Sequence, residues 1–159
     1  MTVSVVVADL DDTTHQAAVL TLTHAYALDH FGNGGALPDD VMARLIDGLR
    51  AHPTTVVFLA FDDHAPVGIA TCFTGFSTFL AKPLLNFHDV AVLPGARGNG
   101  VGRKLLEAAE AFARARAYGK LTLEVIEGNT VARSLYDSFG FAPESHGDDG
   151  PMLFYVKRL

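Results

Sequence analysis

Residues 85–106 read LNFHDVAVLPGARGNGVGRKLL, and this stretch decides the fold. Residues 85–93 are mostly apolar and predict a strand, which Pro94-Gly95 ends. Four glycines then fall within residues 95–102. From about Asn99 to Ala117, apolar residues recur at helical spacing and predict a helix. The stretch therefore predicts a strand that passes through a glycine-rich turn directly into a helix.

Such a turn offers backbone N–H groups without partners, and the positive end of the helix dipole, to an anion. Two familiar phosphate loops do not fit. A P-loop needs Lys and then Ser or Thr after its last glycine, and neither Gly100 nor Gly102 is followed in that way. A dinucleotide fingerprint needs a glycine where Arg103 stands. What remains is the pattern Arg97-x-x-Gly100-x-Gly102.

The charge of the chain is unevenly distributed. Lys and Arg total 12 and Asp and Glu total 18, which gives a net charge of −6 and argues against a general nucleic-acid binder. Residues 1–81 carry nine acidic and two basic residues (−7), and residues 82–159 carry nine and ten (+1). Within 97–120, six basic residues face two acidic ones (+4). This basic window begins at the glycine-rich turn and supports an anion site there.

Other features exclude whole classes of protein. Cys72 is the single cysteine, which excludes an internal disulfide framework and a multi-cysteine zinc site. The histidines lack metal-ligand spacing, so we expect no metal. No apolar run approaches the ~20 residues of a membrane span, and no export signal is recognisable. We therefore expect a cytoplasmic protein that has no membrane partner.

No repeat, low-complexity tract or linker interrupts the chain, so we expect one mixed α/β domain over residues 1–159. The predicted strands are 3–7, 54–61, 66–73 with an irregular continuation to 79, 85–93, 121–126 and 152–156. The predicted helices are 13–31, 38–52, 99–117 and 129–139. We expect Lys82-Pro83 to break the chain, Gly119 to cap the third helix, and 145–150 to form a polar loop.

Two motifs together resemble a known family. The first is Val92-x-Pro94-x-x-Arg97-Gly98-x-Gly100-x-Gly102, and the second comprises Leu123-x-Val125, Asn129, Ala132, Leu135-Tyr136 and Gly140-Phe141. At this separation they resemble the CoA loop and the C-terminal signature of the GNAT superfamily of acetyl-CoA-dependent N-acetyltransferases. The resemblance covers residues 85–142.

The resemblance implies a fold and a cofactor site. We expect a central, mixed, mostly antiparallel sheet flanked by helices, in which the parallel strands 85–93 and 120–126 splay apart around acetyl-CoA. Homodimers are common among such proteins. The cofactor contacts that the resemblance implies are Val90, Ala91, Val92, Arg97, Gly98, Asn99, Gly100, Val101, Gly102, Arg103 and Asn129, with Lys104 either contacting phosphate or facing solvent.

The resemblance also implies catalytic residues. Tyr136 stands at the position of the family's general acid. His88 stands where many relatives carry a Glu that acts as a base, and an imidazole suits that role. Strand alternation is expected to place His88 on one face with Val90 and Val92. Glu124 and Asp89 remain alternative bases.

The sequence indicates the acceptor substrate less directly than it indicates the cofactor. In the family the first two helices help to build the acceptor side, and here they carry Asp29, Asp39, Asp40 and Asp47. An acidic wall attracts cationic substrates, and residues 77–92 weakly resemble the diamine acetyltransferase branch, apart from His88. We therefore expect the acceptor to be the primary amine of a small cationic amine or amino compound, which attacks the acetyl thioester directly in a ternary complex. A protein or peptide amine, and a non-catalytic acyl-CoA-binding module, remain alternatives.

Overall fold

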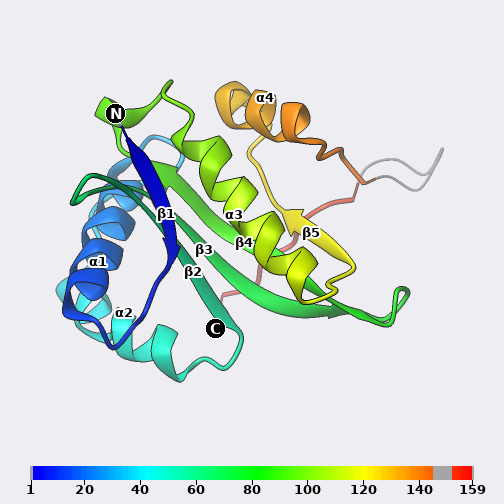
Figure 1. Cartoon of the computed structure of the whole chain (residues 1–159), viewed down its shortest axis with the longest axis horizontal. Helices are drawn as coiled ribbons and strands as arrows, with labels where there is room; N and C mark the ends of the chain where they lie inside the picture. Colours follow the sequence, from blue (N-terminus) through cyan, green and yellow to red (C-terminus); the bar gives the residue numbers. More distant parts are fainter. Residues whose placement is uncertain (1, 145–151, 159) are drawn as a thin grey trace.

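A five-stranded sheet in the order β1-β2-β3-β4-β5 forms the middle of the molecule (Figure 1). The computed structural model describes residues 2–144 and 152–158. The strands are β1 (Val3–Val7), β2 (Thr55–Asp62), β3 (Ala65–Ser77), β4 (Lys82–Val92) and β5 (Lys120–Leu123). The helices are α1 (Thr13–Leu28), α2 (Asp39–Ala51), α3 (Val101–Ala115) and α4 (Thr130–Phe139). Only the β4–β5 pair is parallel among the described strands, which confirms the predicted mixed, mostly antiparallel sheet.

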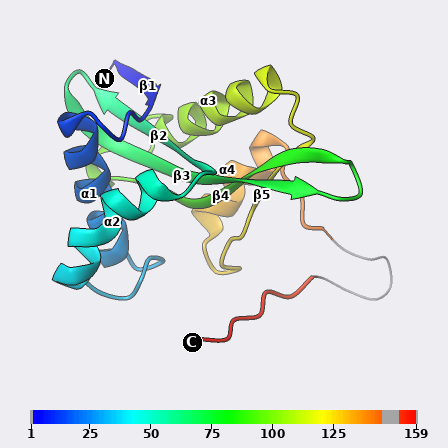
Figure 2. The same cartoon turned by 90° about the horizontal axis from the view of Figure 1, so that it is seen from below.

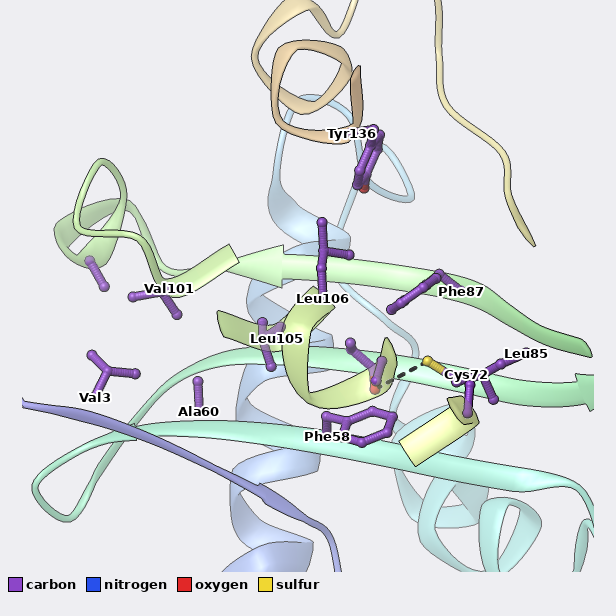
Figure 3. Close-up of a cluster of buried hydrophobic side chains, with 14 residues drawn as sticks. Val3, Phe58, Ala60, Cys72, Leu85, Phe87, Val101, Leu105, Leu106 and Tyr136 are labelled. Carbon is purple, nitrogen blue, oxygen red and sulfur yellow. Dashed lines mark hydrogen bonds between the residues drawn. The ribbon is translucent and has the colours of Figure 1, made fainter. Parts of the chain in front are cut away.

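Helices cover both faces of the sheet, so its central strands are buried on both sides. In β2, Val57, Leu59 and Phe61 pack with α1 and α2, whereas Phe58 and Ala60 pack with α3. Figure 3 shows the cluster on the α3 side. Figure 2 shows the β3–β4 hairpin projecting beyond the helices. The continuous apolar run of β2 thus reflects a strand between two helical layers.

The glycine-rich turn determines where α3 begins. Gly100 has a left-handed backbone (φ 78°), so the helix starts at Val101 and not at Asn99. The other end also differs from the prediction. Ala117 takes the left-handed conformation (φ 56°) expected for Gly119, and its N–H bonds to the Arg114 carbonyl at 3.1 Å. The hydrogen bond to the last turn offsets the steric cost of a side chain there.

Several predicted element ends were wrong. Lys82 and Pro83 lie inside β4 and pair with β3, because proline is tolerated near the start of a strand. The first helix ends at Leu28 and β5 at Leu123, each earlier than predicted. The predicted strand 152–156 is absent from the described residues 152–158, where those side chains are exposed, since strand propensity without a neighbouring strand is insufficient. The predicted loop 145–150 lies outside the described residues.

The two parallel strands diverge after a short ladder. Their pairing runs from Leu84–Lys120 to Phe87–Leu123. Beyond this point β5 has ended, whereas β4 continues to Val92. The splayed pair that the sequence predicted is therefore present, and it opens the sheet at the carboxyl ends of both strands.

Candidate functional site

A cleft of about 830 Å³ lies where β4 and β5 diverge. Its walls are the end of β4, the chain after β5, the C-terminal part of α1, the turn before α3 and the start of α4. The cleft brings together nearly all the site residues predicted from sequence: His88, Val90, Ala91, Val92, Arg97, Gly98, Gly100, Val101, Gly102, Arg103, Glu124, Asn129 and Tyr136. Segments far apart in the sequence thus share one cavity.

One end of the cleft is formed by the glycine-rich turn before α3. Gly98 and Gly100 have φ near +77° and +78°, and a Cβ on either would meet nothing within 4 Å. Gly100 has no side chain to cap α3, and the helix's own hydrogen bonds begin with the Lys104 N–H, which donates to the Gly100 carbonyl at 3.0 Å. The N–H groups of the first turn therefore have no partner within the helix, and such groups suit a phosphate.

The polar side chains in and after this turn mainly form hydrogen bonds with other parts of the chain. Asn99 does not line the cleft, and its amide donates to the Ala96 and Arg97 carbonyls at 3.4 and 3.3 Å. Arg103 donates to Ser138 Oγ at 2.7 Å and so ties α3 to α4. Lys104 is exposed, as the solvent-facing alternative predicted, and its Nζ donates to the Val3 carbonyl of β1 at 2.8 Å. The hydrogen bonds of these three side chains are therefore to other parts of the chain.

A β-bulge places His88 and Asp89. The β3–β4 register shifts so that Thr71 opposes Asp89 while Cys72 opposes Phe87, which leaves His88 as the extra residue. The predicted alternation was therefore wrong. Val90 and Val92 pack on the α3 side, whereas the His88 ring lies 5.5 Å from that of Phe73, which packs on the α1–α2 side. His88 is exposed and lines the cleft.

Two tyrosines from different helices line the cleft. Tyr136 extends from α4 toward the sheet (Figure 3) and is 8% exposed. Burial, with a smaller effect of nearby Tyr26, raises the pKa of Tyr136 to about 12. Burial and then the charge of Asp89 raise the pKa of Tyr26. Burial also raises the pKa of the Asp89 carboxyl, and the nearby charge of His88 lowers it by a smaller amount. The tyrosine hydroxyls therefore keep their protons at neutral pH.

Tyr26 was missed by the sequence interpretation. Leu22, Tyr26 and Asp29 are spaced i, i+4 and i+7 and all line the cleft, so helical periodicity offered a signal. Among the predicted residues, Asn129 caps α4 by accepting the Ala132 N–H at 3.2 Å. Glu124 lines the cleft just after β5.

The predicted acidic wall is not formed. Of the four acids on or near the first two helices, Asp29 lines the cleft and the other three do not. Asp40 pairs with Arg44 at 2.7 Å and Asp47 with Arg50 at 2.9 Å. Asp29 itself pairs with Arg97 at 2.6 Å. Sequence could not show this, because the Asp29–Arg97 pair requires two distant segments to meet.

Within residues 2–144 and 152–158, no three His, Cys, Asp or Glu side chains gather closely enough to hold a metal ion. None of the described helices has the length and apolar character needed to cross a membrane. Cys72 is buried, and its burial raises the pKa of its thiol, so it is a poor nucleophile.

Comparison with known proteins gives the family. The profile described as the Acetyltransferase (GNAT) family matches residues 20–141. The streptothricin acetyltransferase of Streptomyces lavendulae is 47% identical over 58 residues, which are 36% of this chain and 31% of that protein. The uncharacterized N-acetyltransferase YhfO of Bacillus subtilis is 31% identical over 91 residues, which are 57% of this chain and 61% of that protein. The chain thus spans less than two thirds of either relative.

A solved structure shows the same fold over the whole chain. AAC(6')-Iy, in complex with the bisubstrate analogue CoA-S-monomethyl-acetylneamine, superposes with a TM-score of 0.77 at 18% identity and covers 100% of both chains. The profile match spans both motifs and the diverging strands that form the cleft. The chain therefore belongs to the GNAT family of acetyltransferases.

Proposed function

We propose that this protein transfers the acetyl group of acetyl-CoA to the primary amine of a small molecule. One observation carries the proposal: a single cleft contains a glycine-lined helix N-terminus at one end and Tyr136, His88 and Glu124 around the gap between β4 and β5. We also propose that residues 1–159 form one catalytic domain.

The residues of the cleft fit acetyl-CoA, which supplies an activated acetyl thioester. The open glycines and the amides of residues 98–103 suit its pyrophosphate. The last residues of β4, Val90 to Val92, have a backbone edge beyond the end of β5 that suits an amide-containing chain. Asn129 at the start of α4 would contact the cofactor from the opposite wall.

Two proton movements are required, and two side chains suit them. An alkylammonium must lose a proton before its nitrogen can attack a carbonyl, and we propose His88 as the base because it is exposed at the bulge and lines the cleft. Glu124 and Asp89 are the alternatives. Tyr136, which is protonated at neutral pH, donates a hydrogen bond to the departing sulfur and acts as the general acid.

A small acceptor fits the walls of the cleft. The aromatic side chains Tyr26, Phe31 and Phe87 line it together with the carboxylate of Glu124, a combination that suits an amine with an apolar part. The names of the relatives point the same way, since one is a streptothricin acetyltransferase and another was solved with an acetylneamine analogue. Because the acidic wall is absent, we propose that the Glu124 carboxylate attracts the positive charge of the acceptor amine.

We further propose a cytoplasmic homodimer. The buried, unreactive Cys72 suits a reducing compartment. Light scattering of the purified chain tests the dimer, and a monomer across the micromolar range would contradict it.

An amine panel tests the function. Release of CoA from acetyl-CoA is measured with diamines, amino sugars, amino acids, lysine peptides and peptides with free N-termini. We expect turnover with at least one small amine. Turnover with peptides alone would replace the proposed acceptor class with a protein amine. Tight binding of acetyl-CoA in calorimetry, with no turnover of any amine, would replace the enzyme with an acyl-CoA-binding module.

A further inference from the structure

The Arg97 side chain, the first residue of the Arg-x-x-Gly-x-Gly pattern, makes two contacts within the chain. Nε donates to the Val92 carbonyl at 2.9 Å, and Nη2 donates to Asp29 Oδ2 at 2.6 Å. Val92 ends β4 and Asp29 caps the C-terminus of α1. The guanidinium therefore joins the end of β4 to the end of α1, and Arg97 lies 68 residues from Asp29 in the chain.

Asp29 forms hydrogen bonds with residues at the C-terminal end of α1. Its Oδ1 accepts the Phe31 N–H at 3.2 Å, and its backbone N–H bonds to the Tyr26 carbonyl at 3.0 Å. The side chain of Asp29 is only 23% exposed. The hydrogen bond from Arg97, followed by that from Phe31, holds the pKa of Asp29 below its usual value. At neutral pH the carboxylate is thus ionised and engaged through both oxygens.

The turn after α1 has little freedom to change shape. The Gly32 N–H donates to the Asp29 carbonyl at 2.9 Å, and a Cβ on Gly32 would lie 1.8 Å from the Tyr26 carbonyl oxygen. The Tyr26 hydroxyl lies 3.5 Å from the Phe31 carbonyl oxygen, to which it donates. Tyr26 and Phe31 both line the cleft. A displacement of Asp29 would therefore move the aromatic wall as a unit.

We propose that Arg97 is a positioning residue for the acceptor wall and not a ligand of the CoA phosphates. With Asp29 and the Val92 carbonyl it sets the distance between α1 and the end of β4, and it leaves the phosphates to the backbone of residues 98–103. The inference rests on the proposed function, because it assigns Tyr26 and Phe31 to the acceptor side. It departs from the expectation that Arg97 contacts the cofactor.

Binding of CoA separates the two roles of Arg97. The variants Arg97→Gln and Asp29→Asn are titrated with CoA by calorimetry beside the parent protein. A positioning role leaves both dissociation constants within about twofold of the parent value. A phosphate contact would raise the dissociation constant for Arg97→Gln by about tenfold or more, because a charged hydrogen bond would be lost. That result would overturn the inference.

Hydrogen exchange tests the wall directly. We expect faster exchange of the amides of residues 26–35 in both variants, while the amides of α3 exchange as in the parent. In the double variant these amides should exchange as fast as in either single variant, because each substitution removes the Asp29–Arg97 ion pair. The matched control is Asp40→Asn with Arg44→Gln, an exposed ion pair on α2 that does not line the cleft. Unchanged exchange of 26–35 in the Arg97 variant would contradict the inference.

Kinetics with the best amine of the panel complete the test. We expect the acceptor KM to rise by about 10- to 100-fold and kcat to change by less than about threefold, because a misplaced wall weakens substrate positioning. Asp29→Glu should restore part of the loss. If the parent enzyme acetylates the amine and the variants have an unchanged acceptor KM, the role of Arg97 is wrong but the proposed function stands. Absence of turnover in the parent protein instead overturns the proposed function, and CoA titration and exchange still decide the role of Arg97.

Discussion

Replacing Tyr136 by phenylalanine removes one hydroxyl from the cleft and leaves the ring in place. Tyr136 is 8% exposed and its ring lies 5.9 Å from that of Phe141, so packing is kept and the free energy of unfolding should change by less than about 1 kcal/mol. Because the pKa of Tyr136 is about 12, nearly every molecule carries the phenolic proton at pH 7. Loss of a general acid lowers rates by roughly 10²–10⁴-fold, so we expect kcat to fall by about 100-fold, or about 2.7 kcal/mol in the activation barrier.

The assay measures CoA release at saturating acetyl-CoA, with CoA affinity measured in parallel by calorimetry. The matched control is Tyr118→Phe, which removes a hydroxyl that shares a hydrogen bond with Thr74 at 3.0 Å and lies outside the cleft. We expect unchanged CoA affinity in both variants and unchanged kcat in the control. A Tyr136→Phe enzyme with kcat within about threefold of the parent would refute the acid role.

The pH dependence gives a second test of Tyr136. An acid must be protonated to act, so its contribution to kcat is present below its pKa and is lost as the pH rises through it. Since that pKa is about 12, Tyr136 should cause no decline in kcat between pH 7 and 10. A decline in this range that disappears in Tyr136→Phe would show that the assigned ionisation is wrong.

Two further predictions follow from the bulge and from the turn after α1. His88→Gln should lower kcat by about 100-fold, whereas Glu124→Gln should mainly raise the acceptor KM; the opposite pattern would make Glu124 the base. Gly32→Ala forces the backbone to move, because its Cβ would lie 1.8 Å from the Tyr26 carbonyl oxygen, and should lower the free energy of unfolding by about 1–3 kcal/mol. Gly35→Ala, whose Cβ would meet nothing within 4 Å, is the control in thermal unfolding, and equal melting temperatures would contradict the packing argument.

The prediction from sequence was accurate where the signal is local. The strand, glycine-rich turn and helix around Gly100 were recognised because glycine permits the left-handed backbone found there. The last helix, predicted over residues 129–139, is observed over Thr130–Phe139, with the Asn129 side chain as its cap and a left-handed Gly140 after it. Prediction failed where a neighbouring strand is needed, as for residues 152–156, whose apolar and aromatic residues favour a strand but form none in the described structure.

The face on which His88 lies shows the limit most clearly. A strand read alone alternates perfectly, and that rule placed His88 with Val90 and Val92. The bulge arises from the register between β3 and β4, where Thr71 opposes Asp89 and Cys72 opposes Phe87. Register belongs to a pair of strands, so no property of residues 82–92 by themselves could reveal it.

The sequence by itself determined most of the order of elements, the glycine-rich turn at residues 97–103 and the family resemblance, because each depends mainly on residues that are close in the chain. Only the tertiary structure decided what the charges do. Arg97 and Asp29 looked like a phosphate ligand and part of an acidic wall, yet they form one ion pair across the cleft. The physical reason is that the environment of a charge depends on what lies within a few ångströms of it, and here the partner is 68 residues away.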